Sequence, residues 1–217
     1  MPDAEMLDIV DCTGACIGQM ERSRVHEGGH WHKSSHFWIC TALPDPSLFF
    51  QRRSASVTHF ARCLDITAAG HLDAGEVPAD CHREIEEEVG VRIAFDRFHH
   101  LGERAEAMDL RNGDRNREFQ SVFLAQVDLS LSDFCPDPTE VDGIVRIPLG
   151  DLFALTRLEA KSRSCDALLY SQDSGSWHFG RHRVKAGDFL PRTLSYYTNV
   201  GIMAQRLLKG ERPLAIG

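Results

Sequence analysis

The chain has 217 residues, of which 42% are hydrophobic and 26% are charged, and its formal net charge is −8 at pH 7. This length and composition predict one large globular domain, or one domain with an appendage, with an ample core. The acidic balance argues against a general nucleic-acid or anionic-membrane binder, because phosphate-rich partners require a basic surface. A small phosphorylated substrate stays compatible, since it needs only a local arginine, lysine or metal ion.

The cysteine content bears on the compartment. The seven cysteines are an odd number, and the chain shows neither a signal-like N-terminus nor an apolar run long enough to cross a membrane. We therefore expect a reduced, cytoplasmic protein whose thiols pack as small hydrophobic groups.

The first part of the chain is typical of strands, because short apolar or alternating runs are separated by turn residues. The predicted strands cover residues 7–11, 17–20, 36–43, 48–53 and 63–69. The first two should form a hairpin, and the third, an almost unbroken apolar run, should be buried on both faces. Residues 25–32 contain glycines and histidines and are expected to form a loop.

The middle of the chain contains a short helix. Pro78 is tolerated in the first turn of a helix and Gly90 suits the left-handed residue after the last turn, so a helix over 78–89 is predicted. Its apolar stripe consists of Cys81, Ile85 and Val89. Later patterns predict strands over 91–95, 98–108, 117–127 and 144–148, and a helix over 150–158. The Asn-Gly pair within 111–116 favours a hairpin turn, and the polar segment 128–143 favours a loop.

The C-terminal residues show a weaker pattern. Strands are predicted over 167–170 and 177–184, and a helix opens near Pro191 with Asp188 as its N-cap. Apolar residues recur along this helix at spacings of three and four, which indicates either core packing or a subunit contact in a homodimer. These residues are Leu190, Leu194, Tyr197, Gly201, Ala204 and Leu208.

The helix over 78–89 carries a carboxylate cluster. Glu84, Glu87 and Glu88 stand at i, i+3 and i+4, which places them side by side. Like charges at this spacing repel, so bound divalent cations would supply a reason for the cluster. Hard cations such as Mg²⁺ prefer several oxygen ligands and commonly also hold substrate phosphates. The plainer alternative is a solvated helix face, and Glu86, which points elsewhere, should be solvated in either case.

The residues around this helix resemble the Nudix box. Residues 83–91 read REIEEEVGV and match the R-E-U-x-E-E-x-G-U half of that motif, in which U is a bulky aliphatic residue. Gly70 and Glu76 match its G-x5-E half. Six residues separate Glu76 from Arg83, one fewer than in the family pattern, so the loop before the helix is shorter.

The resemblance to the Nudix family implies the fold. It implies an α/β protein, a Nudix-type α/β/α sandwich with a mixed central sheet, here with an N-terminal β-hairpin and a C-terminal helix. We expect residues 1–160 to form the Nudix domain, including the hairpin. Residues 161–217 are expected to form an extension, with a strand pair and a helix, packed on the same domain.

The resemblance also implies roles for the matching residues. Glu84, Glu87 and Glu88, with the carbonyl group of Gly70, would hold Mg²⁺ or Mn²⁺, and a metal-activated water would attack phosphorus in a diphosphate. Arg83 would orient Glu87 through an ion pair.

Further matches resemble the branch of the family that includes isopentenyl-diphosphate isomerase. They are His26 and His32 before an apolar strand, QRRS at 51–54 and AAGH at 68–71. In that branch, histidines matching His26, His32 and His71 bind a metal together with acidic residues, and Glu118 matches a later acidic position. Glu118 is therefore expected to be a metal ligand or the general base.

Three functions are compatible with this resemblance. The isomerase needs an ionisable cysteine at the position where this chain has Ala69. The isomerase also lacks part of the glutamate set of the Nudix box, whereas this chain has Glu84, Glu87 and Glu88. A phosphoanhydride hydrolase acting on a small phosphorylated substrate is therefore predicted, and a non-catalytic binding or regulatory protein is the alternative. Arg52 and Arg53 are candidates for binding substrate phosphate. Because neighbouring strand residues point to opposite faces, only one of the two should reach it.

Overall fold

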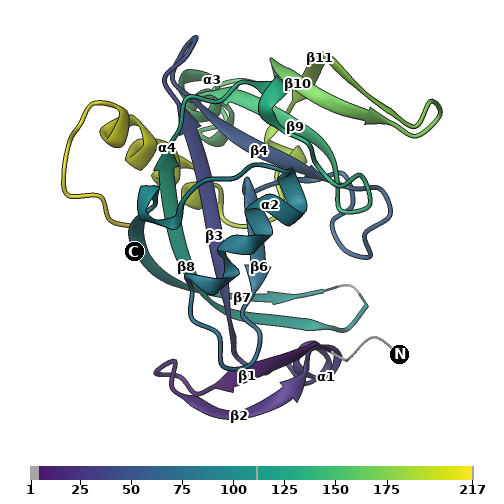
Figure 1. Cartoon of the computed structure of the whole chain (residues 1–217), viewed down its shortest axis with the longest axis vertical. Coiled ribbons are helices and arrows are strands. Elements are labelled where there is room, and N and C mark those ends of the chain that lie inside the picture. The colour runs from purple at the N-terminus through teal and green to yellow at the C-terminus, as the bar shows by residue number, and fades with distance from the viewer. Residues whose placement is uncertain (1–4, 111, 217) are drawn as a thin grey trace.

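The computed structural model describes residues 5–110 and 112–216, so Arg111 of the predicted turn lies outside the described residues (Figure 1). The strands are β1 (Met6–Val10), β2 (Cys16–Glu21), β3 (His32–Thr41), β4 (Ser47–Arg53), β5 (Leu64–Asp65), β6 (Ala68–His71), β7 (His99–Asp109), β8 (Arg115–Gln126), β9 (Val141–Pro148), β10 (Arg163–Ser171) and β11 (Ser176–Val184). The α-helices are α1 (Arg22–Gly28), α2 (Glu84–Val89), α3 (Leu149–Thr156) and α4 (Leu194–Leu208). Short 3₁₀ turns are η1 (Asp80–Arg83), η2 (Phe95–Arg97), η3 (Leu131–Asp133) and η4 (Ala186–Asp188).

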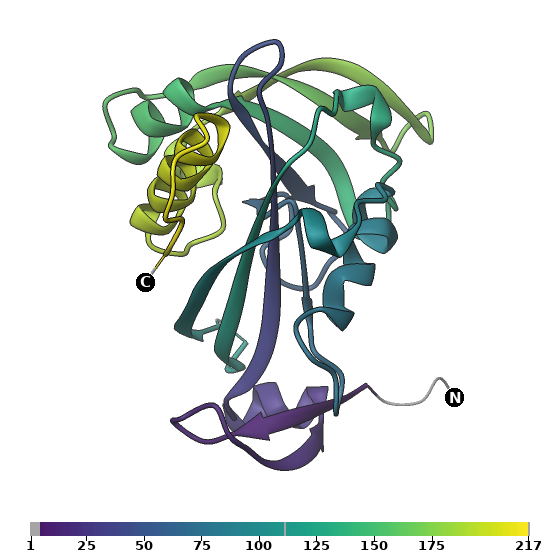
Figure 2. The ribbon, with the colours of Figure 1, turned by 60° about the vertical axis from the view of Figure 1, so that its left-hand side comes forward.

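A nine-stranded mixed sheet lies at the centre of the molecule. Its order is β11-β10-β9-β4-β3-β8-β7, with β5 beside β4 and β6 beside β3, and β3 runs parallel to β8. Helix α2 lies on one side of the central strands and helices α3 and α4 on the other (Figure 2). The predicted α/β fold with a mixed central sheet is thus confirmed, as is the separate N-terminal hairpin of β1 and β2.

The alternation of side chains along β3 builds both cores. Phe37 and Ile39 belong to the cluster that contains Ile85 of α2. Trp38 and Cys40 belong to the cluster that contains residues of α3 and α4. All four β3 side chains are fully buried, as predicted for this apolar run.

Several local predictions are wrong. Of the loop predicted over residues 25–32, only 29–31 form one, because α1 ends at Gly28, Gly29 takes the left-handed conformation (φ 69°) that terminates a helix, and β3 begins already at His32. Residues 91–95 form no strand. Val91 and Ile93 are buried against the α2 core without pairing, so their alternation reflects burial alone.

The two capped helices also differ from expectation. The helix predicted over 78–89 consists of η1 followed by α2, with Gly90 in the left-handed conformation after it (φ 70°). Asp188 does not cap α4, which begins after Thr193. Its carboxylate instead accepts a hydrogen bond from the N–H of Lys185 (2.8 Å) inside η4.

A split between two neighbouring strands creates the space for a site. β3 pairs with β4 only at Cys40 and Thr41, beyond which β3 pairs with β6 and β4 pairs with β5. Thr67 lies at the fork, where its hydroxyl donates to the carbonyl of Phe49 (2.5 Å) and accepts from the N–H of Ile39 (3.1 Å). The predicted strand 63–69 is therefore divided between two partners.

The C-terminal residues complete the same sheet and one core. β10 pairs with β9 and carries β11 at the edge of the sheet. Helix α4 lies against α3, where a Cβ on Gly201 would come within 2.9 Å of the Phe153 ring. Tyr197 and Ala204 are fully buried, so the apolar stripe of α4 is core packing. Across residues 5–110 and 112–216, no helix has the length and apolarity needed to cross a membrane.

Candidate functional site

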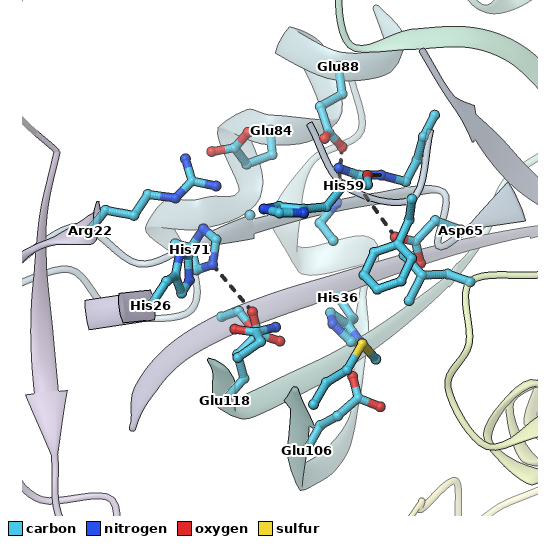
Figure 3. Close-up of a pocket in the computed structure, with 18 of the residues that line it drawn as sticks. Arg22, His26, His36, His59, Asp65, His71, Glu84, Glu88, Glu106 and Glu118 are labelled. Carbon is cyan, nitrogen blue, oxygen red and sulfur yellow. Dashed lines mark hydrogen bonds and ion pairs between the residues drawn. The ribbon is translucent and has the colours of Figure 1, made fainter. Parts of the chain in front are cut away.

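A cleft of about 490 Å³ opens at the split between β3 and β4. Figure 3 shows the side chains of α1, α2 and the neighbouring strands converging on it. Residues from widely separated parts of the chain line it, among them Arg22, His26, Arg53, Gly70, His71, Arg83, Glu84, Glu88, Glu118 and Arg192.

The carboxylate centre, defined by Gly70, Glu84 and Glu88, lies on one side of the cleft. Glu88 is 7% exposed, and its Oε2 accepts hydrogen bonds from the N–H of Ala69 (3.0 Å) and from Nε2 of Gln51 (3.2 Å). Burial raises the pKa of Glu88 well above its usual range. A Cβ on Gly70 would lie 2.5 Å from the side chain of Glu84, so glycine lets the backbone approach this carboxylate.

Burial also works against the charge of Glu84. It raises the pKa of Glu84 to about 7, against the attraction of Arg83 and with help from the negative charge of Glu87. Glu87 itself is exposed and stands outside the residues that line the cleft. Glu86 is exposed and pairs with Arg92 (2.5 Å), as expected for a solvated position.

Arg83 contacts other partners than the one predicted. Its guanidinium pairs with Glu76 (2.7 Å) and Glu84 (3.4 Å), whereas the predicted pair with Glu87 does not form within the described residues. Arg83 closes η1, and the α-helical spacing on which that pair depended begins only with Glu84. Despite the shortened loop, Glu76 reaches the arginine.

The histidine centre, defined by His26, His32, His71 and Glu118, lies on the other side. One ring nitrogen from each histidine lies within 4.8 Å of those of the other two. His32 Nδ1 lies 3.0 Å from the carbonyl of His30. His32 Nε2 is buried and has no hydrogen-bond partner among the described residues. A ring with one nitrogen fixed by a carbonyl and the other free is the usual arrangement of a metal ligand.

Glu118 adds a carboxylate to the three imidazoles. Its Oε1 lies 3.3 Å from Nε2 of His71 and 3.8 Å from Nε2 of His32. Burial opposes its ionisation, but the hydrogen bond with His71 and the neighbouring imidazoles outweigh this and hold the pKa of Glu118 well below its usual range. Burial and the other two histidines lower the pKa of His26 to about 4, which keeps it neutral and able to bind a metal. These donors fit a divalent cation.

The two adjacent arginines of β4 point in opposite directions. Arg52 pairs with Asp142 (2.5 Å) and is absent from the cleft lining, while Arg53 lines the cleft and lies 3.8 Å from Asp65. Strand alternation predicted that only one of them would reach the cleft. A role of Arg53 in substrate binding stays a prediction.

Sequence reasoning missed two arginines of the cleft. Arg22 lies between Glu84 and the histidines in Figure 3. It precedes His26 by four residues on α1, so identifying that helix would have placed both on one face. Arg192 reaches the cleft from the segment before α4, and no local pattern marks it.

Comparisons with known proteins agree with this geometry. Residues 36–169 match the family model of the NUDIX domain. The chain is 26% identical over 197 residues to an uncharacterized Nudix hydrolase of Clostridium acetobutylicum, covering 90% of this chain and 94% of the relative. A Deinococcus radiodurans protein shares the fold with a TM-score of 0.51 and 21% identity over 71% of this chain and 89% of its own. A Nudix hydrolase from Alicyclobacillus acidocaldarius does so with a TM-score of 0.53 and 14% identity over 85% of this chain and 97% of its own. The chain therefore belongs to the NUDIX domain family and is a Nudix hydrolase.

Proposed function

We propose that this hydrolase cleaves the phosphoanhydride bond of a small diphosphate-containing substrate, such as a nucleoside phosphate or a cofactor diphosphate. One observation carries the proposal: two sets of metal-ligand donors face one cleft, with an arginine between them (Figure 3). Arg22 is about half exposed, and Arg53 enters the cleft from β4. Guanidinium groups suit phosphate oxygens, so these two side chains orient the diphosphate.

The carboxylate centre supplies hard oxygen donors, which suit Mg²⁺ or Mn²⁺. Glu84, Glu88 and the Gly70 carbonyl would hold this ion, whereas Glu87, which is exposed and does not line the cleft, would have to turn towards it to join them. A divalent cation bound there neutralises phosphate charge and lowers the pKa of a bound water. Arg83 holds Glu84 and Glu76 together, which fixes the loop against the helix.

The histidine centre suits a cation that accepts nitrogen ligands, such as Mn²⁺. Glu118 was expected to be a ligand or the general base. Its Oε1 lies 3.3 Å from Nε2 of His71 and 3.8 Å from Nε2 of His32, on the side where the imidazoles converge. We therefore assign Glu118 as a ligand of this centre.

The assembled histidine centre also supports placing the chain near the isomerase-like branch. The isomerase reaction itself is not proposed, because Ala69 has no ionisable group to move a proton at carbon. A binding or regulatory protein on the same scaffold would keep the metal donors but would release no product.

A screen of diphosphate compounds tests this function. Wild type and Glu84→Gln are incubated with nucleoside diphosphates and triphosphates, nucleotide sugars, cofactor diphosphates and isopentenyl diphosphate, with Mg²⁺, with Mn²⁺ or with chelator. We expect metal-dependent phosphate or phosphomonoester release from at least one compound, reduced at least ~100-fold by the substitution. Absence of turnover with every compound would favour the binding protein, and formation of dimethylallyl diphosphate would contradict the inference from Ala69.

A further inference from the structure

A buried arginine of the C-terminal segment contacts the floor of the cleft. The side chain of Arg192 is 8% exposed, and its Nε donates to Oε2 of Glu106 (3.0 Å). Its Nη1 donates to Oδ1 of Asp65, which is also buried. One guanidinium thus joins the C-terminal segment to β5 and β7, which lie far apart in the sequence.

Glu106, the partner of Arg192, also contacts Gln120. The Nε2 group of Gln120 donates to Oε2 of Glu106 (3.0 Å) and to Oε2 of Glu118 (2.5 Å). Its Oε1 accepts from Nη1 of Arg104 (2.5 Å), which also pairs with Glu106 through Nη2 (2.8 Å). Arg192 and Arg104 therefore hold Glu106 from two directions, and Glu106 holds the Gln120 amide.

The orientation of the Gln120 amide follows from these charges. Rotating the amide by half a turn would place its oxygen against two carboxylates and its NH₂ group against a guanidinium. Gln120 is fully buried, so water cannot replace the lost hydrogen bonds. The amide therefore keeps Oε2 of Glu118 engaged and leaves Oε1 facing His71 and His32.

Strand register explains why the contacts form a row. Glu106 pairs with Glu118 and Arg104 pairs with Gln120 between β7 and β8, while His32 pairs with Glu118 between β3 and β8. Arg192 and its other partner, Asp65 of β5, lie outside this row. It adds positive charge beside the buried Asp65 and Glu106, which also lie near Arg53 (3.8 Å) and Arg104 (2.8 Å), respectively.

We propose that Arg192 is a positioning residue for the histidine centre, which it reaches through Glu106 and Gln120. It keeps Glu118 Oε1 aimed at the point where the imidazoles converge, so the C-terminal extension completes the site. The inference rests on the proposed metal-binding role of that centre.

The test measures metal binding rather than turnover. The purified full chain is titrated with Co²⁺, whose visible absorption changes with the coordination of the ion, and His32→Asn identifies the part of the signal that belongs to the histidine centre. Arg192→Lys keeps the charge but loses the two-pronged geometry, and Gln120→Met breaks the next link while leaving Arg192 paired. Arg146→Lys is the matched control, because Arg146 is similarly shielded and pairs with Asp166 (2.7 Å) outside the cleft.

Arg192→Lys and Gln120→Met should each weaken Co²⁺ binding at the histidine centre by about 10-fold or more, as for other residues behind metal ligands. The double variant should be no weaker than the worse single variant, because both act on Glu118. Arg146→Lys should bind as wild type does. Wild-type affinity in Arg192→Lys, with only a lower unfolding midpoint, would overturn the positioning role but leave the histidine centre in place. A wild-type signal unchanged by His32→Asn would overturn the centre itself, and the inference with it.

Discussion

Burial in the folded protein disfavours the ionised form of the Glu84 side chain. Its pKa of about 7 lies above the ordinary value of 4.5, mainly because of burial. A group whose pKa is raised on folding contributes stability that is fully present below the unfolded pKa and lost as the pH rises through the folded pKa. For Glu84 that interval runs from about pH 4.5 to about pH 7. A bound cation would favour the ionised carboxylate and so offset this loss of stability.

The substitution Glu84→Gln should therefore become relatively more stabilising as the pH rises. In chelator, the Tm of the variant minus that of wild type should increase by a few degrees between pH 5 and pH 8, because glutamine never ionises. Added Mg²⁺ at pH 8 should raise the Tm of wild type more than that of the variant. Glu86→Gln, at an exposed position, is the control. A Tm difference that stays constant over this pH range would contradict the raised pKa of Glu84.

At the scale of single elements, β6 and α2 approach each other closely at Gly70. A Cβ there would lie 2.5 Å from the Glu84 side chain, while a Cβ on Gly150 would meet nothing within 4 Å. Gly70→Ala should displace the Glu84 carboxylate and lower metal-dependent kcat/KM by about 100-fold, since small displacements in a site have large kinetic effects. Gly150→Ala should be near neutral. Equal kcat/KM for the two variants would show that Gly70 is not part of the carboxylate centre.

The elements also differ in how far sequence could predict them. Gly90 marks the end of the carboxylate-bearing helix, and the apolar run of β3 predicts burial on both faces, because these signals are local; the start predicted at Pro78 was two residues before η1. Helix α1 was missed because Gly28 and Gly29, which end it, suggested a loop. The split of β3 from β4 could not be predicted from the sequence, since it depends on which strands pair.

The same reasoning applies to the site residues. Glu84, Glu88, His26, His32, His71 and Glu118 were all predicted, and the structure brings them to one region of the molecule. The motif spacing alone could not show that Arg83 turns toward Glu76 instead of Glu87. Arg192 was missed because its partners, Asp65 and Glu106, are remote in sequence and adjacent only in the folded sheet.

At the scale of the whole molecule, helix α4 joins the C-terminal residues to the central sheet through Tyr196. Its hydroxyl accepts from Nε1 of Trp38 (3.0 Å) and lies 2.7 Å from Nδ1 of His36. The guanidinium of Arg104 lies 4.2 Å from the centre of the same ring. The C-terminal helix is therefore part of the core beside the cleft, and the extension should unfold together with the rest.

Tyr196→Phe should lower the free energy of unfolding by about 1–3 kcal/mol, because it leaves buried polar groups of Trp38 and His36 without their partner. The measurement is urea unfolding, followed by Trp fluorescence and by circular dichroism. Tyr170→Phe, at a partly exposed position, should change the free energy by much less. Two separate transitions in wild type would contradict a single cooperative unit.

The role of the carboxylate centre is tested most directly by the rate at which Glu88→Gln hydrolyses the best substrate of the screen, followed by ³¹P NMR in Mg²⁺. Glutamine keeps the shape and can still accept the hydrogen bond from Ala69, so the fold should persist. We predict a loss of at least ~100-fold in kcat, as expected when a ligand of a catalytic metal ion is removed, with Glu86→Gln unchanged. A Glu88→Gln variant that cleaves the P–O–P bond at the wild-type rate would contradict hydrolysis at this centre.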